Sequence, residues 1–207
     1  MTKIKICGIT RTEDALFCDS LGIDFLGFIF VEKSPRFVGN PDKFRDIKTK
    51  AKKVAVFMNQ KIEFQKLTNF EFIQLHGFEG EEIITEAKSK GFGIIKTIFP
   101  ELKESVKLCE RIAELVDYFL VDSSSKLASK SGKFDEKSLN GILNDGKIFN
   151  KAFFLSGGIN TENVSFYIEK IRPFGVDVSS GVEEIPGIKS HKEVEKFVKT
   201  VRSKTIE

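Results

Sequence analysis

Short apolar runs alternate with segments of helical spacing along this entire chain. Eight runs have the character of β-strands, and they are Lys3–Cys7, Phe25–Phe30, Val54–Phe57, Phe72–Gln74, Gly93–Lys96, Tyr118–Val121, Phe153–Leu155 and Val176–Val178. Helical spacing predicts a helix after each run, over Thr12–Leu21, Pro41–Thr49, Ile62–Leu67, Glu79–Lys90, Leu102–Leu115, Asp135–Leu143, Asn160–Ile171 and Ser190–Val201. Strands and helices in this alternation favour a parallel sheet with right-handed connections, so few topologies remain.

Eight strand–helix units in 207 residues predict a single-domain (β/α)8 TIM barrel that spans residues 1–207. The rival architecture is an open doubly wound sheet, which usually has a glycine-rich dinucleotide loop after its first strand. The run Cys7-Gly8-Ile9-Thr10-Arg11-Thr12 has one glycine and cannot form that loop. Because the composition does not shift along the chain and no linker interrupts it, we predict no second domain.

The composition excludes several classes of protein. No apolar run approaches the ~20 residues of a membrane span, and the chain enters a strand at once without a signal-peptide pattern, so we expect a cytoplasmic protein. The net charge is only +3 and the basic residues are spread along the chain, which does not predict a nucleic-acid partner. The three cysteines, Cys7, Cys18 and Cys109, have neither paired nor metal-ligand spacing, so we expect no disulfide framework and no metal site.

Two ionisable residues stand where predicted strands end. Cys7 closes the first strand before a glycine, and Asp122 follows the sixth strand before a serine-rich loop. In one parallel barrel both side chains open onto the same mouth, where they could move a proton on and off a substrate. Cys7 would need a pKa below its ordinary ~8.5 to act as the base. Lys5 stands two residues earlier, so its side chain could point to the same face of the strand as Cys7. Asp122 would have to stay protonated to act as the acid. The simpler interpretation of Cys7 is a small buried residue, and that of Asp122 is a side chain that caps the following loop.

The loops after the last two strands have the composition of a phosphate site. Gly157 and Gly158 follow the seventh strand directly before a helix, and Ser179, Ser180 and Gly181 follow the eighth. Adjacent glycines let backbone N–H groups close on an anion, and in this fold these two loops commonly bind phosphate. The glycine pair could form only a tight turn, but two such loops in consecutive final positions favour phosphate.

An arginine and a histidine are further candidates for binding substrate. Arg36 lies in the long loop after the second strand and could pair with a substrate carboxylate, or it could stack on Phe37 at the surface. His76 closes the fourth strand in Gln74-Leu75-His76-Gly77, so it would face the mouth and either orient substrate or hold another side chain. The other histidine, His191, lies at a helix start, where we expect it to be solvated.

Taken together, these segments resemble the phosphoribosylanthranilate isomerase family of tryptophan synthesis. The matching runs, in order along the chain, are Lys5–Thr10, Gly27–Phe30, Ser34–Val38, Val56–Asn59, Gln74–Gly77, Val121–Ser123, Leu155–Ile159, Glu162–Val164, Val176–Glu183 and Pro186–Gly187. They cover almost the whole chain, and the ordered set is far more specific than any single run.

The resemblance implies an Amadori rearrangement of N-(5′-phosphoribosyl)anthranilate to 1-(2-carboxyphenylamino)-1-deoxyribulose 5-phosphate, an isomerisation that needs no cofactor. It implies Cys7 as general base, Asp122 as general acid, Arg36 near the anthranilate carboxylate, Asp177 near a sugar hydroxyl, and the two glycine-bearing loops around the phosphate. The chain departs from the family in Ser129–Asp135, which keeps one glycine where the family usually has a Gly-Gly-Thr-Gly type of stretch. That difference bears on how this loop closes over substrate.

Two other functions fit part of the pattern. Another phosphosugar isomerase or epimerase would keep the fold and the phosphate loops but would not require Cys7, Asp122 and Arg36 together. A non-catalytic phospholigand-binding barrel would bind ligand without needing either ionisable group. We therefore expect an enzyme that acts on a phosphosugar-anthranilate substrate, has no nucleic-acid or membrane partner, and is a monomer or a homodimer.

Overall fold

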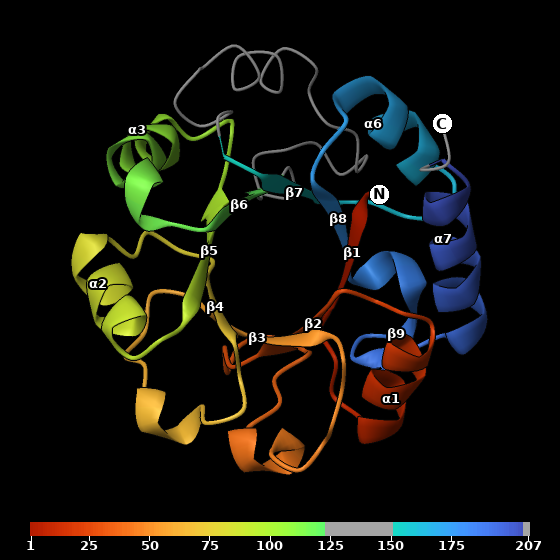
Figure 1. Ribbon diagram of the computed structural model, residues 1–207, viewed down its shortest axis with the longest axis horizontal. Coiled ribbons are helices and arrows are strands. Elements are labelled where there is room, and N and C mark those ends of the chain that lie inside the picture. The colour runs from red at the N-terminus through yellow and green to blue at the C-terminus, as the bar shows by residue number, and fades with distance from the viewer. Residues whose placement is uncertain (123–150, 205–207) are drawn as a thin grey trace.

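A closed barrel of eight parallel strands forms the centre of the computed structural model, which describes residues 1–122 and 151–204. Helices surround the barrel (Figure 1). The strands are β1 (Lys3–Cys7), β2 (Phe25–Ile29), β3 (Lys52–Phe57), β4 (Phe72–Leu75), β5 (Gly93–Ile98), β6 (Tyr118–Asp122), β7 (Phe153–Ser156) and β8 (Gly175–Val178). They pair in sequence order, and β8 pairs with β1 to complete the ring. The predicted TIM barrel is confirmed, and each predicted strand end lies within two residues of the observed one.

The helices on the outside of the barrel agree in part with the prediction. The α-helices are α1 (Thr12–Ser20), α2 (Glu81–Ser89), α3 (Lys103–Ile112), α6 (Val164–Ile171) and α7 (His191–Ser203). Short 3-10 turns are η1 (Pro41–Phe44), η2 (Phe64–Lys66), η3 (Ala113–Leu115) and η4 (Ser180–Val182). The predicted helix Asp135–Leu143 lies outside the described residues.

Two predicted helices, over Pro41–Thr49 and Ile62–Leu67, are wrong, because the chain forms only η1 and η2 there. Asn40 and Pro41 do start a turn, and the Asn40 side chain accepts a hydrogen bond from a backbone N–H. Phe44 is its one buried residue, so no apolar face continues after it. The second segment is too short to offset the cost of helix nucleation.

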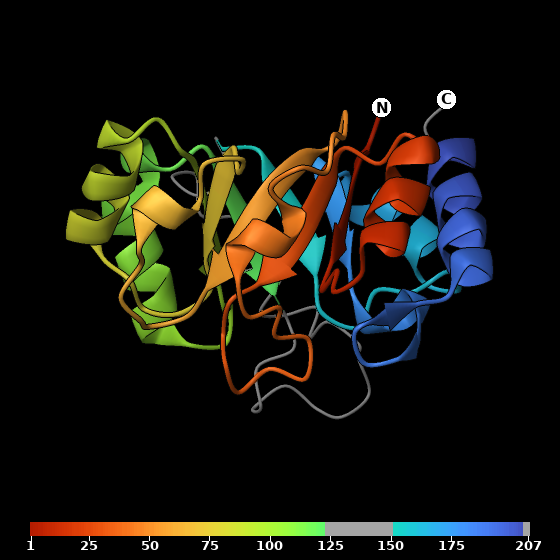
Figure 2. The same cartoon turned by 90° about the horizontal axis from the view of Figure 1, so that it is seen from below.

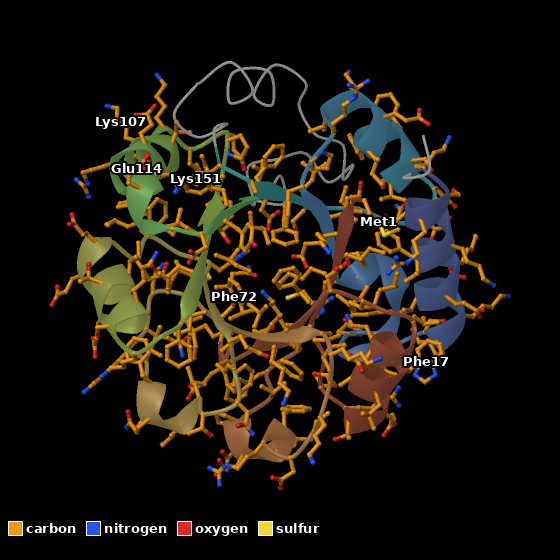
Figure 3. All side chains as sticks on the ribbon, in the orientation of Figure 1. Met1, Phe17, Phe72, Lys107, Glu114 and Lys151 are labelled. Carbon is orange, nitrogen blue, oxygen red and sulfur yellow. The ribbon has the colours of Figure 1, made fainter. Side chains whose placement is uncertain are left out.

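Aromatic side chains fill the interior of the barrel near the beginning of the strands. Phe25 makes edge-to-face contacts with Phe72 and Phe154, with ring centroids 5.6 and 5.1 Å apart, and Tyr118 stacks on Phe174 at 4.9 Å. Figure 3 shows Phe72 inside the ring of strands. Because this aromatic layer fills the amino-terminal half of the barrel, the space for a ligand that the described residues form lies toward the carboxyl ends of the strands.

Alternation along the strands decides which side chains reach that mouth. Successive residues of a strand point to opposite faces, so Lys5 and Cys7 both point inward on β1. Cys7 and Asp122 are the last residues of β1 and β6, and the register aligns Lys5 with Asp177 and Asp122 with Ser156. Residues far apart in the sequence therefore meet at one rim. In the side view, the loop after β2 and the segment after β8 lie at the same lower end of the barrel (Figure 2).

A short antiparallel ribbon follows η4 and was not predicted. Its strands are β9 (Glu183–Ile185) and β10 (Ile188–Lys189), and they lead into α7. The ribbon carries two buried charged side chains, Glu183 and Lys189, to the edge of the mouth. Among the described residues, none of the helices has both the length and the apolar character that a membrane crossing requires.

Candidate active site

A cavity of about 320 Å³ opens at the carboxyl ends of the strands. It collects nearly all of the side chains that the sequence singles out, and its lining includes Cys7, Arg36, His76, Asp122, Gly157, Gly158, Asp177, Ser179 and Ser180. Gln74 and Ser156 also line it. Of the predicted site residues, only Gly181 is not in the lining. The barrel thus brings the thiol and the carboxyl together over one space.

Cys7 is 6% exposed, and its sulfur lies beside the ammonium group of Lys5. A Cβ placed on Gly27, the β2 neighbour of Cys7, would lie 2.7 Å from Cys7 Sγ and 3.1 Å from Lys5 Nζ, so both atoms occupy the space that this glycine leaves. Burial raises the pKa of the Cys7 thiol, and the charges of Lys5 and Lys189 oppose this effect without overcoming it. The structure therefore does not meet the condition of a pKa below the ordinary value, because desolvation of the thiolate outweighs the nearby cations.

Lys5 and Asp177 form a buried ion pair beneath the thiol. Lys5 Nζ lies 2.9 Å from Asp177 Oδ1, and the Lys5 side chain is fully buried. Burial alone would lower the pKa of Lys5, but the charges of Asp177 and Cys7 raise it by more. The ammonium therefore stays charged. The second oxygen of Asp177 accepts a hydrogen bond of 3.3 Å from Ser156 Oγ, so both carboxylate oxygens have partners inside the protein.

His76 lies beside Asp122 at the opposite side of the cavity from β1. The ring atom His76 Nε2 is 3.7 Å from Asp122 Oδ2, and Asp122 is 5% exposed. Burial lowers the pKa of His76, although the charge of Asp122 acts in the other direction. The imidazole is therefore neutral at neutral pH. Its predicted position at the mouth is confirmed, and the side chain that its Nε2 faces is Asp122.

Arg36 reaches the cavity from the loop after β2 and pairs with Glu183 on the β9–β10 ribbon. Arg36 Nε lies 2.8 Å from Glu183 Oε1, and Nη2 lies 2.6 Å from Oε2. Lys189 Nζ lies 2.7 Å from the same Oε1 and donates a 2.6 Å hydrogen bond to the Cys7 carbonyl oxygen. Burial would raise the pKa of Glu183, but the hydrogen bonds from Arg36 and Lys189 lower it by more. The Arg36 guanidinium is thus held in place by Glu183 and not by Phe37.

The two predicted phosphate loops touch each other at the rim of the cavity. Gly157 and Gly158 have φ angles of 96° and 67°, which favour glycine. A Cβ on Gly181 would stand 2.2 Å from the Ile159 carbonyl oxygen, so this glycine lets the loops approach. The Ser179 hydroxyl is buried, and no hydrogen-bond partner for its Oγ is found in the described part of the chain. This donor is available to an anion.

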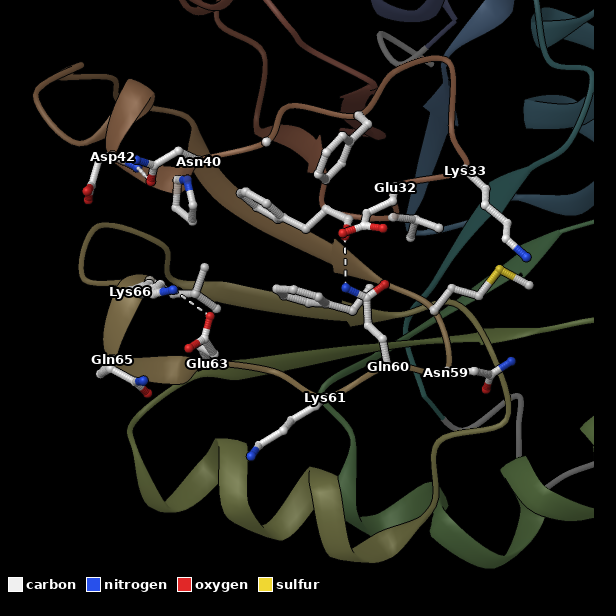
Figure 4. A pocket seen from close by; sticks show the side chains of 18 of the residues that line it. Glu32, Lys33, Asn40, Asp42, Asn59, Gln60, Lys61, Glu63, Gln65 and Lys66 are labelled. Carbon is white, nitrogen blue, oxygen red and sulfur yellow. Dashed lines mark hydrogen bonds and ion pairs between the residues drawn. The ribbon is translucent and has the colours of Figure 1, made fainter.

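A larger cavity of about 1030 Å³ lies between the loops after β2 and β3, where η1 and η2 replace full helices (Figure 4). Gln60 joins its two sides through a 2.8 Å hydrogen bond from Nε2 to the Phe30 carbonyl oxygen. Charged surface residues line this groove, and it meets the smaller cavity at Val31 and Met58. None of the predicted site residues lines the groove, so we place the site in the smaller cavity. No cluster of His, Cys, Asp or Glu suited to a metal ion occurs within residues 1–122 and 151–204.

Four residues with polar contacts to the site were missed at the level of sequence. Gln74 and Thr97 contact His76, and Glu183 and Lys189 connect Arg36 to the Cys7 backbone. Gln74 and Thr97 could have been recognised by counting inward positions along β4 and β5. Nothing in the sequence distinguishes Lys189 from the other basic residues, because its burial depends on the ribbon.

Comparisons with known proteins agree with this site. Residues 4–200 match the family model described as N-(5'phosphoribosyl)anthranilate (PRA) isomerase. The chain is 40% identical to the N-(5'-phosphoribosyl)anthranilate isomerase of Aquifex aeolicus, over 98% of this chain and 100% of the relative. A monomeric form of the dimeric Thermotoga maritima isomerase superposes with a TM-score of 0.78 at 32% identity, covering 98% of this chain and 99% of that one.

A second solved isomerase is bound to reduced 1-(o-carboxyphenylamino)-1-deoxyribulose 5-phosphate. It superposes with a TM-score of 0.80 at 30% identity, and the match covers 98% of this chain and 100% of that one. Sequence and fold are therefore matched over nearly the full length of the chain. This chain belongs to the N-(5'-phosphoribosyl)anthranilate isomerase family.

Proposed function

We propose that this chain converts N-(5′-phosphoribosyl)anthranilate into 1-(2-carboxyphenylamino)-1-deoxyribulose 5-phosphate, a step of tryptophan synthesis, with Asp122 as general acid and Cys7 as general base. The observation that carries the proposal is that both side chains line one cavity at the mouth of the barrel. Family membership supports the reaction, and a solved relative binds the reduced form of the product.

In the first step Asp122 donates its proton to the ring oxygen of the ribose. The bond between that oxygen and C1′ breaks, and the electron pair of the anilino nitrogen forms the C=N bond of an iminium ion. The carboxyl becomes a carboxylate as the furanose opens. His76 lies 3.7 Å from one of its oxygens and is available to hold the carboxylate that forms.

In the second step the Cys7 thiolate removes the proton from C2′. The electron pair of the broken C–H bond moves into a C1′=C2′ double bond, and the iminium nitrogen regains its lone pair. The enolamine then becomes the ketone as the hydroxyl on C2′ loses its proton and C1′ gains one. The adjacent iminium makes the C2′ proton acidic, so a small thiolate fraction suffices. The ammonium of Lys5 beside the sulfur stabilises that thiolate.

Arg36 would bind the anthranilate carboxylate. Glu183 occupies the Nε and Nη2 side of the guanidinium, and no hydrogen bond to Nη1 is found among the residues that the structure describes. A second carboxylate can therefore approach from the Nη1 side. A guanidinium between two carboxylates keeps its charge, because the hydrogen bond to Glu183 raises the pKa of Arg36.

The substrate phosphate would lie between the loops after β7 and β8. Gly157 and Gly158 allow the first loop to turn tightly, and Gly181 lets the second loop pack against it. Ser179 and Ser180 line the same cavity and bring hydroxyl donors. Backbone amides and hydroxyls bind a phosphate without requiring a lysine or arginine in contact with it. Asp177 would act mainly through Lys5, since both of its oxygens already have partners.

The deciding experiment measures the loss of anthranilate fluorescence with synthesised phosphoribosylanthranilate. We expect turnover by the wild-type protein, and a drop in kcat of at least about 10²-fold in Cys7→Ser and in Asp122→Asn, because each removes a proton-transfer group. The matched control is Cys18→Ala, which removes a buried thiol on α1 that does not line the cavity.

Wild-type protein that binds the substrate without turnover would instead support a phospholigand-binding barrel. Turnover of Cys7→Ser or Asp122→Asn at nearly the wild-type rate would refute the assigned roles. Turnover of an unrelated phosphosugar in place of this substrate would favour another isomerase or epimerase.

The proposal extends to the state of the protein in the cell. We infer that the enzyme is cytoplasmic and that residues 1–207 form a single domain. We also infer that it is a monomer or a homodimer. The Thermotoga maritima relative is dimeric and also yields monomers. Light scattering of the purified protein at several concentrations decides between the two states.

A further inference from the structure

Gln74 and Thr97 surround the inner nitrogen of His76. Gln74 Nε2 lies 3.2 Å from His76 Nδ1, and Thr97 Oγ1 lies 3.0 Å from the same atom. Gln74 is 2% exposed and Thr97 is fully buried, so water does not compete for these contacts. The outer nitrogen, Nε2, faces Asp122 at 3.7 Å. Each ring nitrogen thus has its own defined neighbours.

The chemistry of the amide decides which nitrogen carries the proton. The NH2 group of a glutamine only donates hydrogen bonds, so His76 Nδ1 has to accept, and a neutral ring then carries its proton on Nε2. The carbonyl end of the same amide, Gln74 Oε1, is buried and has no partner among the described residues. The reverse orientation of the amide would place an acceptor on Nδ1 and move the proton there. The position of the proton therefore reports the orientation of Gln74.

We propose that Gln74 and Thr97 are positioning residues that hold His76 as the neutral tautomer with its proton on Nε2, so that His76 presents a hydrogen-bond donor to Asp122. The inference rests on the proposed role of Asp122 as the general acid. With Nε2 already protonated and Nδ1 occupied, His76 cannot take the proton of Asp122. That proton goes to the ring oxygen of the substrate instead.

The same contact favours the transition state over the ground state. While Asp122 is protonated, the His76 N–H faces a neutral carboxyl. As the O–H bond of Asp122 breaks and the O–H bond to the sugar forms, the carboxylate becomes charged and attracts the His76 N–H, which faces it at 3.7 Å in the resting protein, into a charge-assisted hydrogen bond. An interaction that strengthens during the step raises kcat and changes KM little.

Burial is the main reason that the ring stays neutral, because it lowers the pKa of His76. The nearby charges act in both directions: Asp122 on β6 and Asp177 on β8 favour the imidazolium, whereas Lys5 on β1 and Lys96 on β5 disfavour it. A protonated His76 would be a buried cation whose two carboxylate neighbours are matched by two ammonium groups. The neutral donor is the state that the surrounding strands permit.

Long-range ¹H–¹⁵N NMR on ¹⁵N-labelled protein tests the tautomer without any assay of activity. The chain has two histidines, so the His191→Gln variant assigns both sets of signals. At neutral pH we expect a pyridine-like Nδ1 and a pyrrole-like Nε2 for His76. The opposite tautomer, or an imidazolium pattern, would overturn the proposal. Because this readout does not depend on turnover, an inactive wild-type protein would refute the proposed function and leave the tautomer measurable.

Variants of the two supporting residues test their role. We expect Thr97→Val and Gln74→Leu to mix the tautomers of His76 and to lower kcat about 10- to 100-fold, with KM changed far less. Thr97→Ser restores the hydroxyl, so it should recover the wild-type tautomer and most of kcat. The His191 signals verify the fold of each variant within the same spectrum. An unchanged His76 tautomer or an unchanged kcat in both Thr97→Val and Gln74→Leu would contradict the positioning role.

Discussion

Lys5 offers a direct test of how the barrel makes a usable thiolate from a buried cysteine. Its ammonium is fully buried and lies beside the Cys7 sulfur. Both Lys5 Nζ and Cys7 Sγ lie within about 3 Å of the point where a Cβ on Gly27 would stand. Their separation is therefore below about 6 Å. At an effective dielectric constant of about 20, a charge at that distance stabilises the thiolate by about 3 kcal/mol. Lys5→Met should therefore raise the pKa of Cys7 by roughly 2 pH units.

The pH dependence of alkylation by iodoacetamide measures this pKa, because the reagent reacts with the thiolate. The pKa of Cys7 is raised above its ordinary value by burial, so the wild-type rate should still be increasing at pH 9. In Lys5→Met the rate at pH 8 should fall by about 100-fold, since the thiolate fraction drops tenfold for each pH unit. Cys18 and Cys109 are fully buried with pKa values raised to about 12, so they add little background.

Two further variants separate the local charge from other effects. Lys3→Met makes the same change two residues earlier on β1, at the other end of the barrel, and should leave the pKa of Cys7 unchanged. In Lys5→Met the Asp177 carboxylate loses its partner, and its charge raises the pKa of Cys7. Adding Asp177→Asn removes that charge and should bring the pKa of Cys7 partly back down. If Lys5→Met shifts the pKa no more than Lys3→Met does, the electrostatic argument fails.

Two more predictions concern the binding of substrate. Arg36→Ala should raise KM about 10- to 100-fold with a small change in kcat, because it removes a charged hydrogen bond made to both substrate and transition state. An unchanged KM would contradict the contact between Arg36 and the substrate carboxylate. Gly181→Ala forces a Cβ onto the Ile159 carbonyl oxygen, so it should weaken the inhibition of turnover by inorganic phosphate about 10-fold. The control Gly80→Ala has nothing within 4 Å of the added carbon and should leave this inhibition unchanged. Equal inhibition constants for both glycine variants would refute the packing of the two loops.

Local patterns in the sequence were sufficient for the barrel and for most of the residues at its mouth. The eight strands were predicted because each is a short apolar run between helical segments. Cys7 and Asp122 were predicted because a residue at the end of a strand in this fold stands at the mouth. The error at Pro41–Thr49 has the same local origin, since a capped turn looks like the start of a helix whether or not an apolar face follows it.

Long-range contacts escaped prediction because they depend on the register of the closed barrel and on the β9–β10 ribbon. Lys189 is one of 33 basic residues, and only the ribbon carries it to the carbonyl of Cys7. The state of the thiol also depends on the tertiary structure. The sequence indicated only that Lys5 could point the same way as Cys7, whereas the cost of removing the thiolate from water, which raises the pKa of Cys7, follows from its burial.

The sequence by itself determined the architecture, the family and the identity of the groups at the mouth, because strand length, strand order and residue type are local properties. Only the tertiary structure decided the charge and the orientation of those groups. Burial and the contact between β1 and β8 determine how strongly Cys7 holds its proton. The contacts between β4, β5 and β6 determine the neighbours of the two ring nitrogens of His76. Electrostatic energies depend on distance and on the surrounding medium, and neither is defined until the barrel closes.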